Sequence, residues 1–240
     1  MPTRVNFEQQ LNELKKSLDD MGSSVEYSID RIFEALNSMS KDTIDAVIKN
    51  ERVISDMERA IEAQCLSLIT RQQPIVGDLR LISSALKVVT DIERVGGHAV
   101  DIAELISRWE NGSLLDYSSH LSPMIQASKE MVHEAVEAFT NQDSERAKKV
   151  IDADDVVDDL FNKMKKDIIE TLKQQEASSK KEEPAGFVMK DKNGNPASAD
   201  ICIDMMMIAK YLEKIGDHAV NIAEWEIFRE TGSINNVRLL

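Results

Sequence analysis

The sequence predicts an all-α protein built from two tandem, pseudo-symmetric three-helix bundles. Only 5% of the 240 residues are aromatic and only 9 are glycine, a composition that argues against β-sandwiches and barrels. Prolines occur only at positions 2, 74, 123, 184 and 196, and the stretches between them repeat apolar residues every three or four positions, as helices do. An internal duplication is the third observation.

The duplication is visible in two pairs of segments. Residues 91–104 recur at 211–224 with an offset of 120, and eight of the 14 positions are identical. Residues 48–57 align with 151–160 at an offset of 103. The difference of 17 residues predicts an insertion between the fifth and sixth helices, near 174–198. We therefore expect a first bundle with an N-terminal extension over 1–119 and a second over 120–240.

The first three helices follow from apolar spacing and from capping residues. A stripe that repeats about every 3.5 residues predicts the first helix near 6–38. Ser40 is a plausible N-cap for a second helix that ends near 70, and the Gln-Gln-Pro-Ile-Val-Gly segment precedes a third helix over about 78–109. The stripe of the first helix consists of Leu11, Leu14, Leu18, Met21, Val25, Ile29, Ile32 and Leu36.

Three further helices are expected in the second half. Ser122-Pro123 opens the fourth, with proline at the first helical position. Asp143 caps the fifth, which runs to about 174, and the sixth covers about 198–229. Within the insertion, Phe187-Val-Met ahead of Asn193-Gly194 allows a small hairpin, but a mobile solvated loop is the favoured interpretation.

Charge excludes several classes of function. The 29 basic and 43 acidic residues give a formal net charge of -14, which disfavours binding to nucleic acids and anionic lipids and favours cations or basic proteins as partners. Cys65 and Cys202 support neither a disulfide framework nor a thiolate zinc site and fit a reducing cytoplasm. No apolar run approaches the roughly 18 residues of a membrane span, and the first residues contain no apolar signal core.

Carboxylates interrupt the apolar seams of two helices. In the second helix, Glu51 and Glu58 occupy positions that should face the bundle, and Asp154 takes the place of Glu51 in the fifth helix. A buried carboxylate is costly, so it requires a salt bridge, a metal ion or a helix rotation that carries it to solvent. All three solutions remain open from the sequence.

Acidic pairs four residues apart suggest a metal site in the second half. Asp154 and Asp158 share one helical face, as do Glu213 and Asp217, so two facing helices can present four carboxylates to one ion or cluster. Oxygen-rich sites suit magnesium, manganese, calcium or iron. Asp155 and Asp159 form a neighbouring pair of secondary candidates.

The first half retains only part of this pattern. Its equivalent pairs are Glu51 with Ser55 and Glu93 with Gly97, so each has lost its second carboxylate. Glu51 and Glu93 are therefore secondary candidates, and three nearby acids are able to compensate from adjacent faces. These are Asp56, Asp91 and Asp101.

Other chemistry-bearing residues favour structural roles. His98 and His218 recur at equivalent positions, and we interpret them as hydrogen-bonded packing residues rather than direct ligands. The pair Glu130 and His133 has the spacing of diiron enzymes but occurs only once. The recurrence of a mid-helix glycine, at Gly96 and Gly216, suggests close approach of neighbouring helices. The methionine-rich segment 205–207 suggests core packing or a dimer surface.

These motifs resemble the PhoU family over nearly the full chain. The resemblance rests on the doubled Glu-(Arg/Lys)-(Val/Ile)-Gly-x-His-Ala-Val segments at 93–100 and 213–220, on Gln-Pro-Ile-Val-Gly-Asp-Leu-Arg at 73–80, and on the (Glu/Asp)-x-x-x-Asp repeats. It implies two three-helix bundles that hold clusters of iron, zinc, manganese or magnesium. Carried over position by position, the motif gives Asp154, Asp158, Glu213 and Asp217 as metal ligands.

The resemblance also implies a non-catalytic function. It suggests a cytoplasmic homodimer that keeps phosphate-starvation signalling off when phosphate is plentiful, through contacts with the ATPase of the phosphate ABC transporter and with a sensor histidine kinase. Such contacts would place the chain at the membrane only through its partners. The acidic pairs alone support a second hypothesis, a divalent-metal buffer or a carboxylate-bridged metalloenzyme unrelated to phosphate.

Overall fold

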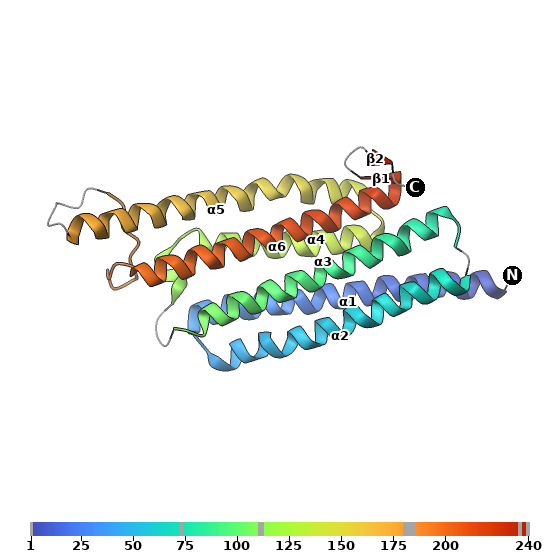
Figure 1. The fold of residues 1–240 in the computed structure, drawn as a ribbon, viewed down its shortest axis with the longest axis horizontal. Coiled ribbons are helices and arrows are strands. Elements are labelled where there is room, and N and C mark those ends of the chain that lie inside the picture. Colours follow the sequence, from blue (N-terminus) through green and yellow to red (C-terminus); the bar gives the residue numbers. More distant parts are fainter. Residues whose placement is uncertain (1, 73, 110–112, 180–185, 235–236, 239–240) are drawn as a thin grey trace.

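The computed structural model describes residues 2–72, 74–109, 113–179, 186–234 and 237–238, and it confirms the predicted all-α fold. Long helices run side by side along the molecule, and both chain ends lie at the same end of it (Figure 1). The helices are α1 (Pro2–Ser38), α2 (Lys41–Gln72), α3 (Val76–Ile106), α4 (Leu121–Asn141), α5 (Ser144–Ser179) and α6 (Ala199–Thr231).

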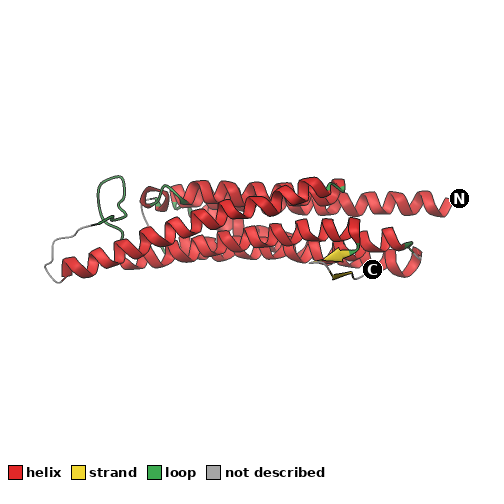
Figure 2. Cartoon of the chain, turned by 90° about the horizontal axis from the view of Figure 1, so that it is seen from above, coloured by secondary structure: helices red, strands yellow, loops and turns green. Residues whose placement is uncertain are grey.

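Shorter elements complete the chain. A 3-10 turn, η1 (Leu114–Tyr117), lies between α3 and α4. Two short strands, β1 (Ser233–Ile234) and β2 (Val237–Arg238), follow α6 and pair antiparallel. They lie beside the helices near the C-terminus (Figure 2).

The helices pack as two groups of three that share a central layer. Helices α1, α2 and α3 contact one another, and so do α4, α5 and α6. Between the groups, α1 packs on α4 and α3 packs on α6, which leaves α2 and α5 on the two outer sides (Figure 1). No helix within the described ranges is long and apolar enough to cross a membrane.

The predicted apolar seams form the core. Every residue of the α1 stripe is buried. The apolar seam positions of α2, from Ile44 to Leu68, are also buried, whereas Glu51 and Glu58 remain partly exposed at the same seam. Burying such stripes between helices provides most of the stability of a bundle.

Side-chain caps define the starts of α5 and α6, and the cap predicted at Asp143 is confirmed. Asp143 Oδ1 accepts a hydrogen bond of 2.9 Å from the backbone N–H of Arg146 at the start of α5. Ser198 accepts one of 3.2 Å from the N–H of Ile201 at the start of α6. Gly232 ends α6 with a left-handed φ of 73°, which glycine adopts without a steric penalty.

The start of α4 differs from the prediction. The helix begins at Leu121 with His120 as its N-cap, so Pro123 is the third helical residue rather than the first. Backbone N–H groups in the first turn have no partner within the helix, and proline at this place therefore removes no helical hydrogen bond.

Two other helix ends also differ. Helix α5 continues to Ser179, beyond the expected end near 174, because the intervening residues contain no glycine or proline. Helix α3 ends at Ile106, short of Trp109. Positions 180–185 of the predicted insertion lie outside the described residues.

The described part of the insertion is ordered against the bundle. Lys190 and Pro196 form an antiparallel bridge that closes a small hairpin. Met189 is buried, and its backbone N–H donates a hydrogen bond of 3.0 Å to Thr171 Oγ1 on α5. The structure therefore shows the small hairpin, the less favoured of the two interpretations, although most residues of 186–198 are exposed to solvent.

Candidate metal centre

The four carboxylates predicted in the second half lie along the contact between α5 and α6. Asp154 and Asp158 come from α5, and Glu213 and Asp217 come from α6. Gly216 permits their approach, since a Cβ atom at this position would stand 3.3 Å from Asp154 Oδ1. The recurring mid-helix glycine thus has the close-packing role that the sequence suggested.

Mutual proximity of these groups changes their acidity. Burial raises the pKa of Asp154 to about 6, and the carboxylates of Asp158, Asp217 and Glu213 contribute in the same direction. Burial also raises the pKa of Asp158, with further contributions from Glu213 and Asp217. Concentrated negative charge makes this region favourable for a cation.

Two lysines of α6 supply positive charge at the same place. Lys210 Nζ lies 2.5 Å from Glu213 Oε2 and 5.5 Å from the centre of the Phe161 ring. Lys214 Nζ lies 3.4 Å from Glu213 Oε2 and also pairs with Asp217. Sequence reasoning missed both lysines, although each stands three residues before its carboxylate, at a spacing that favours ion pairs.

The donor set fits a metal ion, while the present side-chain arrangement does not yet form a coordination shell. Carboxylate oxygens are the ligands that magnesium, manganese and iron accept. Within the described residues, however, no three His, Cys, Asp or Glu side chains are arranged to hold a metal. Metal binding here would require Lys210 and Lys214 to release Glu213 and Asp217.

The secondary candidates of α5 face outward. Asp155 and Asp159 are exposed. Asp155 lies close enough to contribute to the raised pKa values of Asp154 and Asp158.

The first half contains a different arrangement. Glu51 Oε1 accepts a hydrogen bond of 2.9 Å from Ser55 Oγ, so the two members of this degenerate pair bind each other. Glu93 is 23% exposed, and Arg94 Nε lies 3.8 Å from its Oε2. Open space surrounds the position where a Cβ of Gly97 would stand.

Glu58 is the first-half acid that sequence reasoning left without a role. Burial raises its pKa, and the nearby carboxylate of Glu93 adds to the effect. Glu58 corresponds to Phe161 at the offset of 103, and Thr90 corresponds to Lys210 at the offset of 120. The first half therefore has a carboxylate in place of the aromatic ring and a threonine in place of the lysine. The seam register of the second helix already placed Glu58 toward the bundle, and this was the available signal.

The three acids considered as compensating ligands pair with other side chains. Asp56 Oδ1 lies 2.5 Å from Arg59, and Asp101 Oδ2 lies 3.1 Å from His98 Nδ1. Asp91 Oδ1 lies 2.8 Å from His218 Nδ1, across the contact between α3 and α6. The first two pairs lie within one helix and the third joins α3 to α6, so the three acids do not form one set.

The two repeated histidines meet at the contact between α3 and α6. The ring centres of His98 and His218 are 5.4 Å apart, and His98 also packs 5.5 Å from Tyr211. This arrangement agrees with the interpretation of both histidines as packing residues. His133 belongs to a different contact, with its Nδ1 3.0 Å from Glu26 Oε1 on α1.

Comparison with known proteins identifies the family. The sequence matches the family model described as "PhoU domain" twice, over residues 18–106 and 121–225. It is 33% identical over 231 residues to a "Phosphate-specific transport system accessory protein PhoU homolog" of Clostridium acetobutylicum, with 96% of each chain covered. A homologue of the same description from Aquifex aeolicus is 37% identical over 162 residues, covering 67% of this chain and 73% of that one.

Solved structures agree in fold. The crystal structure of PhoU from Pseudomonas aeruginosa superposes with a TM-score of 0.79 at 27% identity, covering 95% of this chain and 100% of the other. The phosphate transport system regulatory protein PhoU from Streptococcus pneumoniae gives the same TM-score at 24% identity, with 95% and 98% covered.

Proposed function

Because the chain belongs to the PhoU family, we propose that it is a negative regulator and adapter of phosphate uptake and phosphate-starvation signalling. The observation that carries the proposal is the match over 96% of both chains to a relative described as a phosphate-specific transport system accessory protein. A match of this extent includes both halves of the duplicated fold.

The proposed adapter works through protein contacts. Its partners are the ATPase of the phosphate ABC transporter and a sensor histidine kinase, which it meets at the membrane as a cytoplasmic homodimer. The net charge of -14 supports contacts with basic protein surfaces and opposes direct adsorption to anionic lipids.

The proposal contains no catalytic step. Each of the four histidines lies beside a carboxylate: Asp101 for His98, Asp167 for His120, Glu26 for His133 and Asp91 for His218. Two of these pairs, His133 with Glu26 and His218 with Asp91, link different helices, and His120 at the N-cap of α4 contacts Asp167 on α5. Such pairs fix helix packing.

A metal ion is part of the proposed regulation. Asp154, Asp158, Glu213 and Asp217 would hold iron, zinc, manganese or magnesium, and the ion would supply the positive charge that these carboxylates require. The first-half acids Glu51 and Glu93 offer a second place for a metal, to which Glu58 adds a carboxylate.

The acidic contact between α5 and α6 also favours a second candidate function, a metal buffer or carboxylate-bridged metalloenzyme that is independent of phosphate. This candidate would retain its metal capacity without any contact with the transporter. Measuring protein partners therefore separates the two candidates.

Crosslinking in living cells tests the adapter function. Affinity-tagged full-length chain is crosslinked during growth with abundant phosphate, and the captured proteins are identified by mass spectrometry. We expect the transporter ATPase and the kinase to be enriched relative to a tagged, unrelated acidic protein of similar abundance. Recovery of neither partner, while the chain still crosslinks to itself, would contradict the proposal.

A further inference from the structure

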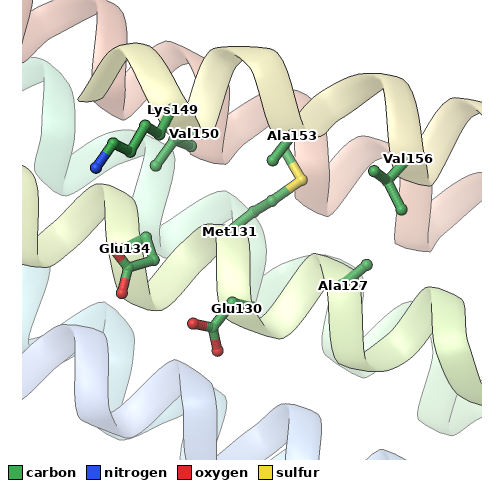
Figure 3. Close-up of a pocket in the computed structure, with 8 residues that line it drawn as sticks. All are labelled: Ala127, Glu130, Met131, Glu134, Lys149, Val150, Ala153 and Val156. Atoms are coloured by element: carbon green, nitrogen blue, oxygen red, sulfur yellow. The ribbon is translucent and has the colours of Figure 1, made fainter. Parts of the chain in front are cut away.

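An apolar groove runs between α4 and α5 on the outer side of the second half. Its volume is about 240 Å³, enough for one large apolar side chain. Figure 3 shows Met131 reaching from α4 toward Ala153 on α5, with Val156 further along α5. The lining residues are Ala127, Glu130, Met131, Glu134, Lys149, Val150, Ala153 and Val156.

The equivalent face of the first half is filled by a polar network. Asn50 stands where α5 has Ala153, and its Nδ2 donates hydrogen bonds of 2.8 Å to the carbonyl of Ser24 and 2.9 Å to Ser28 Oγ. The two serines correspond to Ala127 and Met131 at the offset of 103. Duplication therefore produced two similar faces, and the second carries the apolar groove.

Acidic side chains flank the groove on both sides. Glu130 on the α4 side and Asp152 and Asp159 on the outer face of α5 are exposed, and none of the three forms a hydrogen bond or ion pair within the described residues. Glu134 differs because Arg146 binds it, and Lys149 adds positive charge near it. The unpaired carboxylates favour a cationic group on the occupant.

We propose that this groove binds an amphipathic helix of a partner protein, with one large apolar side chain in the cavity and Lys or Arg side chains against Glu130, Asp152 and Asp159. An apolar anchor between charged flanks is how a helix is recognised in a groove. The acidic flanks oppose an anionic membrane surface. The inference rests on the proposed adapter function and names the surface through which the chain would bind a partner.

Met131 connects this groove to the candidate metal centre. Its side chain forms the floor of the groove, and its Cε lies 3.7 Å from the position where a Cβ of Gly216 would stand. Asp154 Oδ1 lies 3.3 Å from the same position. An occupant of the groove therefore contacts a methionine that packs beside the carboxylate set.

The test uses the purified full-length chain and a model peptide. The probe is a fluorescein-labelled amphipathic helix of about 16 residues, with a leucine stripe flanked by lysines. Two control peptides replace the lysines by glutamate or the leucines by serine. Fluorescence anisotropy gives the affinity, and the NMR signal of the ¹³C-labelled Met131 methyl group reports the place of binding.

A matched pair of variants separates the groove from general charge attraction. Val156 is 52% exposed at the groove, and Val53, its equivalent on α2, is 51% exposed. We expect Val156→Lys to weaken binding of the lysine peptide by about tenfold or more, and Val53→Lys to change it by less than about threefold. Glu130→Lys should also weaken it, and the Met131 signal should shift on binding to the native chain.

Four results would overturn the proposal. These are absence of binding by the lysine–leucine peptide, equal weakening by both valine variants, equal binding of either control peptide, or binding without a shift of the Met131 signal. Transporter capture that persists while peptide binding fails would reject this groove and leave the adapter function standing. Peptide binding without transporter capture would instead contradict the adapter function and leave the groove as a binding site for a basic amphipathic helix.

Discussion

At the scale of single residues, Asp154 shows why the α5–α6 contact is suited to a cation. Its carboxylate lies beside α6 where Gly216 leaves room for it, and its pKa is raised to about 6 by burial and by Asp158, Asp217 and Glu213. The folded protein therefore holds an uncompensated charge near neutral pH. A metal ion or a protonation event relieves that cost.

Replacing Asp154 by Asn should stabilise the metal-free protein in a pH-dependent way. Since the folded-state pKa is above the ordinary value, the stability of the native chain falls as pH rises from about 4 to 6. In EDTA at pH 7.5, Asp154→Asn should increase the free energy of unfolding by about 1 to 2 kcal/mol, after allowance for solvent screening. The gain should vanish near pH 4.

Urea denaturation measures this effect, and Asp152→Asn on the exposed face of the same helix is the control. The control should change stability by less than about 0.5 kcal/mol at either pH. Equal gains in both variants would show that reduced overall charge, rather than the carboxylate set, is responsible.

Lys210 should compete with metal ions for Glu213. Lys210→Met keeps an apolar side chain near Phe161 but removes the ammonium 2.5 Å from Glu213. We expect affinity for Mn²⁺, measured by calorimetry, to rise by about tenfold, because one competing cation is lost. Stability in EDTA should fall by about 1 kcal/mol, since Glu213 is mostly buried.

The control for Lys210 is Lys148→Met, because Lys148 forms an ion pair of the same spacing and length with Glu145 on exposed surface. It should leave both Mn²⁺ affinity and stability almost unchanged. If the two lysine variants behave alike, Lys210 has no special relation to the carboxylate set.

Sequence reasoning predicted which second-half acids share a surface but not what neutralises them. Helical spacing and repetition placed Asp154 and Glu213 correctly on facing seams. The positions of Lys210 and Lys214 depend on rotamers that choose between solvent and a carboxylate, and apolar periodicity carries no information on that choice. Glu58 received no role because it is not part of a (Glu/Asp)-x-x-x-Asp pair, although it lies close enough to Glu93 on α3 for that carboxylate to raise its pKa.

At the scale of elements, two adjacent glycines of α3 have different surroundings. A Cβ on Gly96 would stand 3.0 Å from Ile54 Cδ1 on α2, whereas a Cβ on Gly97 would meet no heavy atom within 4 Å. The first glycine permits close helix packing. The second only weakens the helix, because glycine has low helical propensity.

Alanine substitutions should therefore have opposite effects. Gly97→Ala should raise the free energy of unfolding by about 0.5 to 1 kcal/mol through helical propensity. Gly96→Ala should lower it by about 1 to 3 kcal/mol, because Ile54 must move from a packed site. Thermal or urea unfolding of the two variants provides the comparison, and stabilisation by Gly96→Ala would contradict the packing role.

Helix boundaries were predictable where a side-chain cap defines them, as at Asp143 and Ser198. They were less predictable at Pro123, because proline is tolerated anywhere in the first helical turn. The hairpin at 186–198 depends on burial of Met189 against the bundle, a tertiary contact that local turn signals do not contain.

At the scale of the whole molecule, the two halves are joined by complementary charges. On one side of the contact, α1 provides Glu26 and Asp30, and α4 provides His133 and Lys129. Lys129 Nζ lies 2.7 Å from Asp30 Oδ1, and the hydrogen bond that His133 Nδ1 donates to Glu26 Oε1 raises the pKa of His133. Two ion pairs between α1 and α4 therefore link the duplicated units, with the acidic members on α1 and the basic members on α4.

Divergence between the halves also separates their expected tasks. The second half has the full carboxylate set and the apolar groove, while the first half has a polar network at the equivalent of the groove. The duplication itself could be predicted from repeated residues. The groove could not, because it arises from small side chains on two helices whose contact the sequence does not specify.

A phosphate-regulated reporter tests most directly the proposal that this chain represses the phosphate-starvation response. Secreted phosphatase activity is measured during growth with abundant phosphate in cells lacking the protein, with the native gene restored as the control. We expect high activity without the protein and low activity after restoration. Low activity in both strains, in cells without a second copy of the gene, would contradict the account.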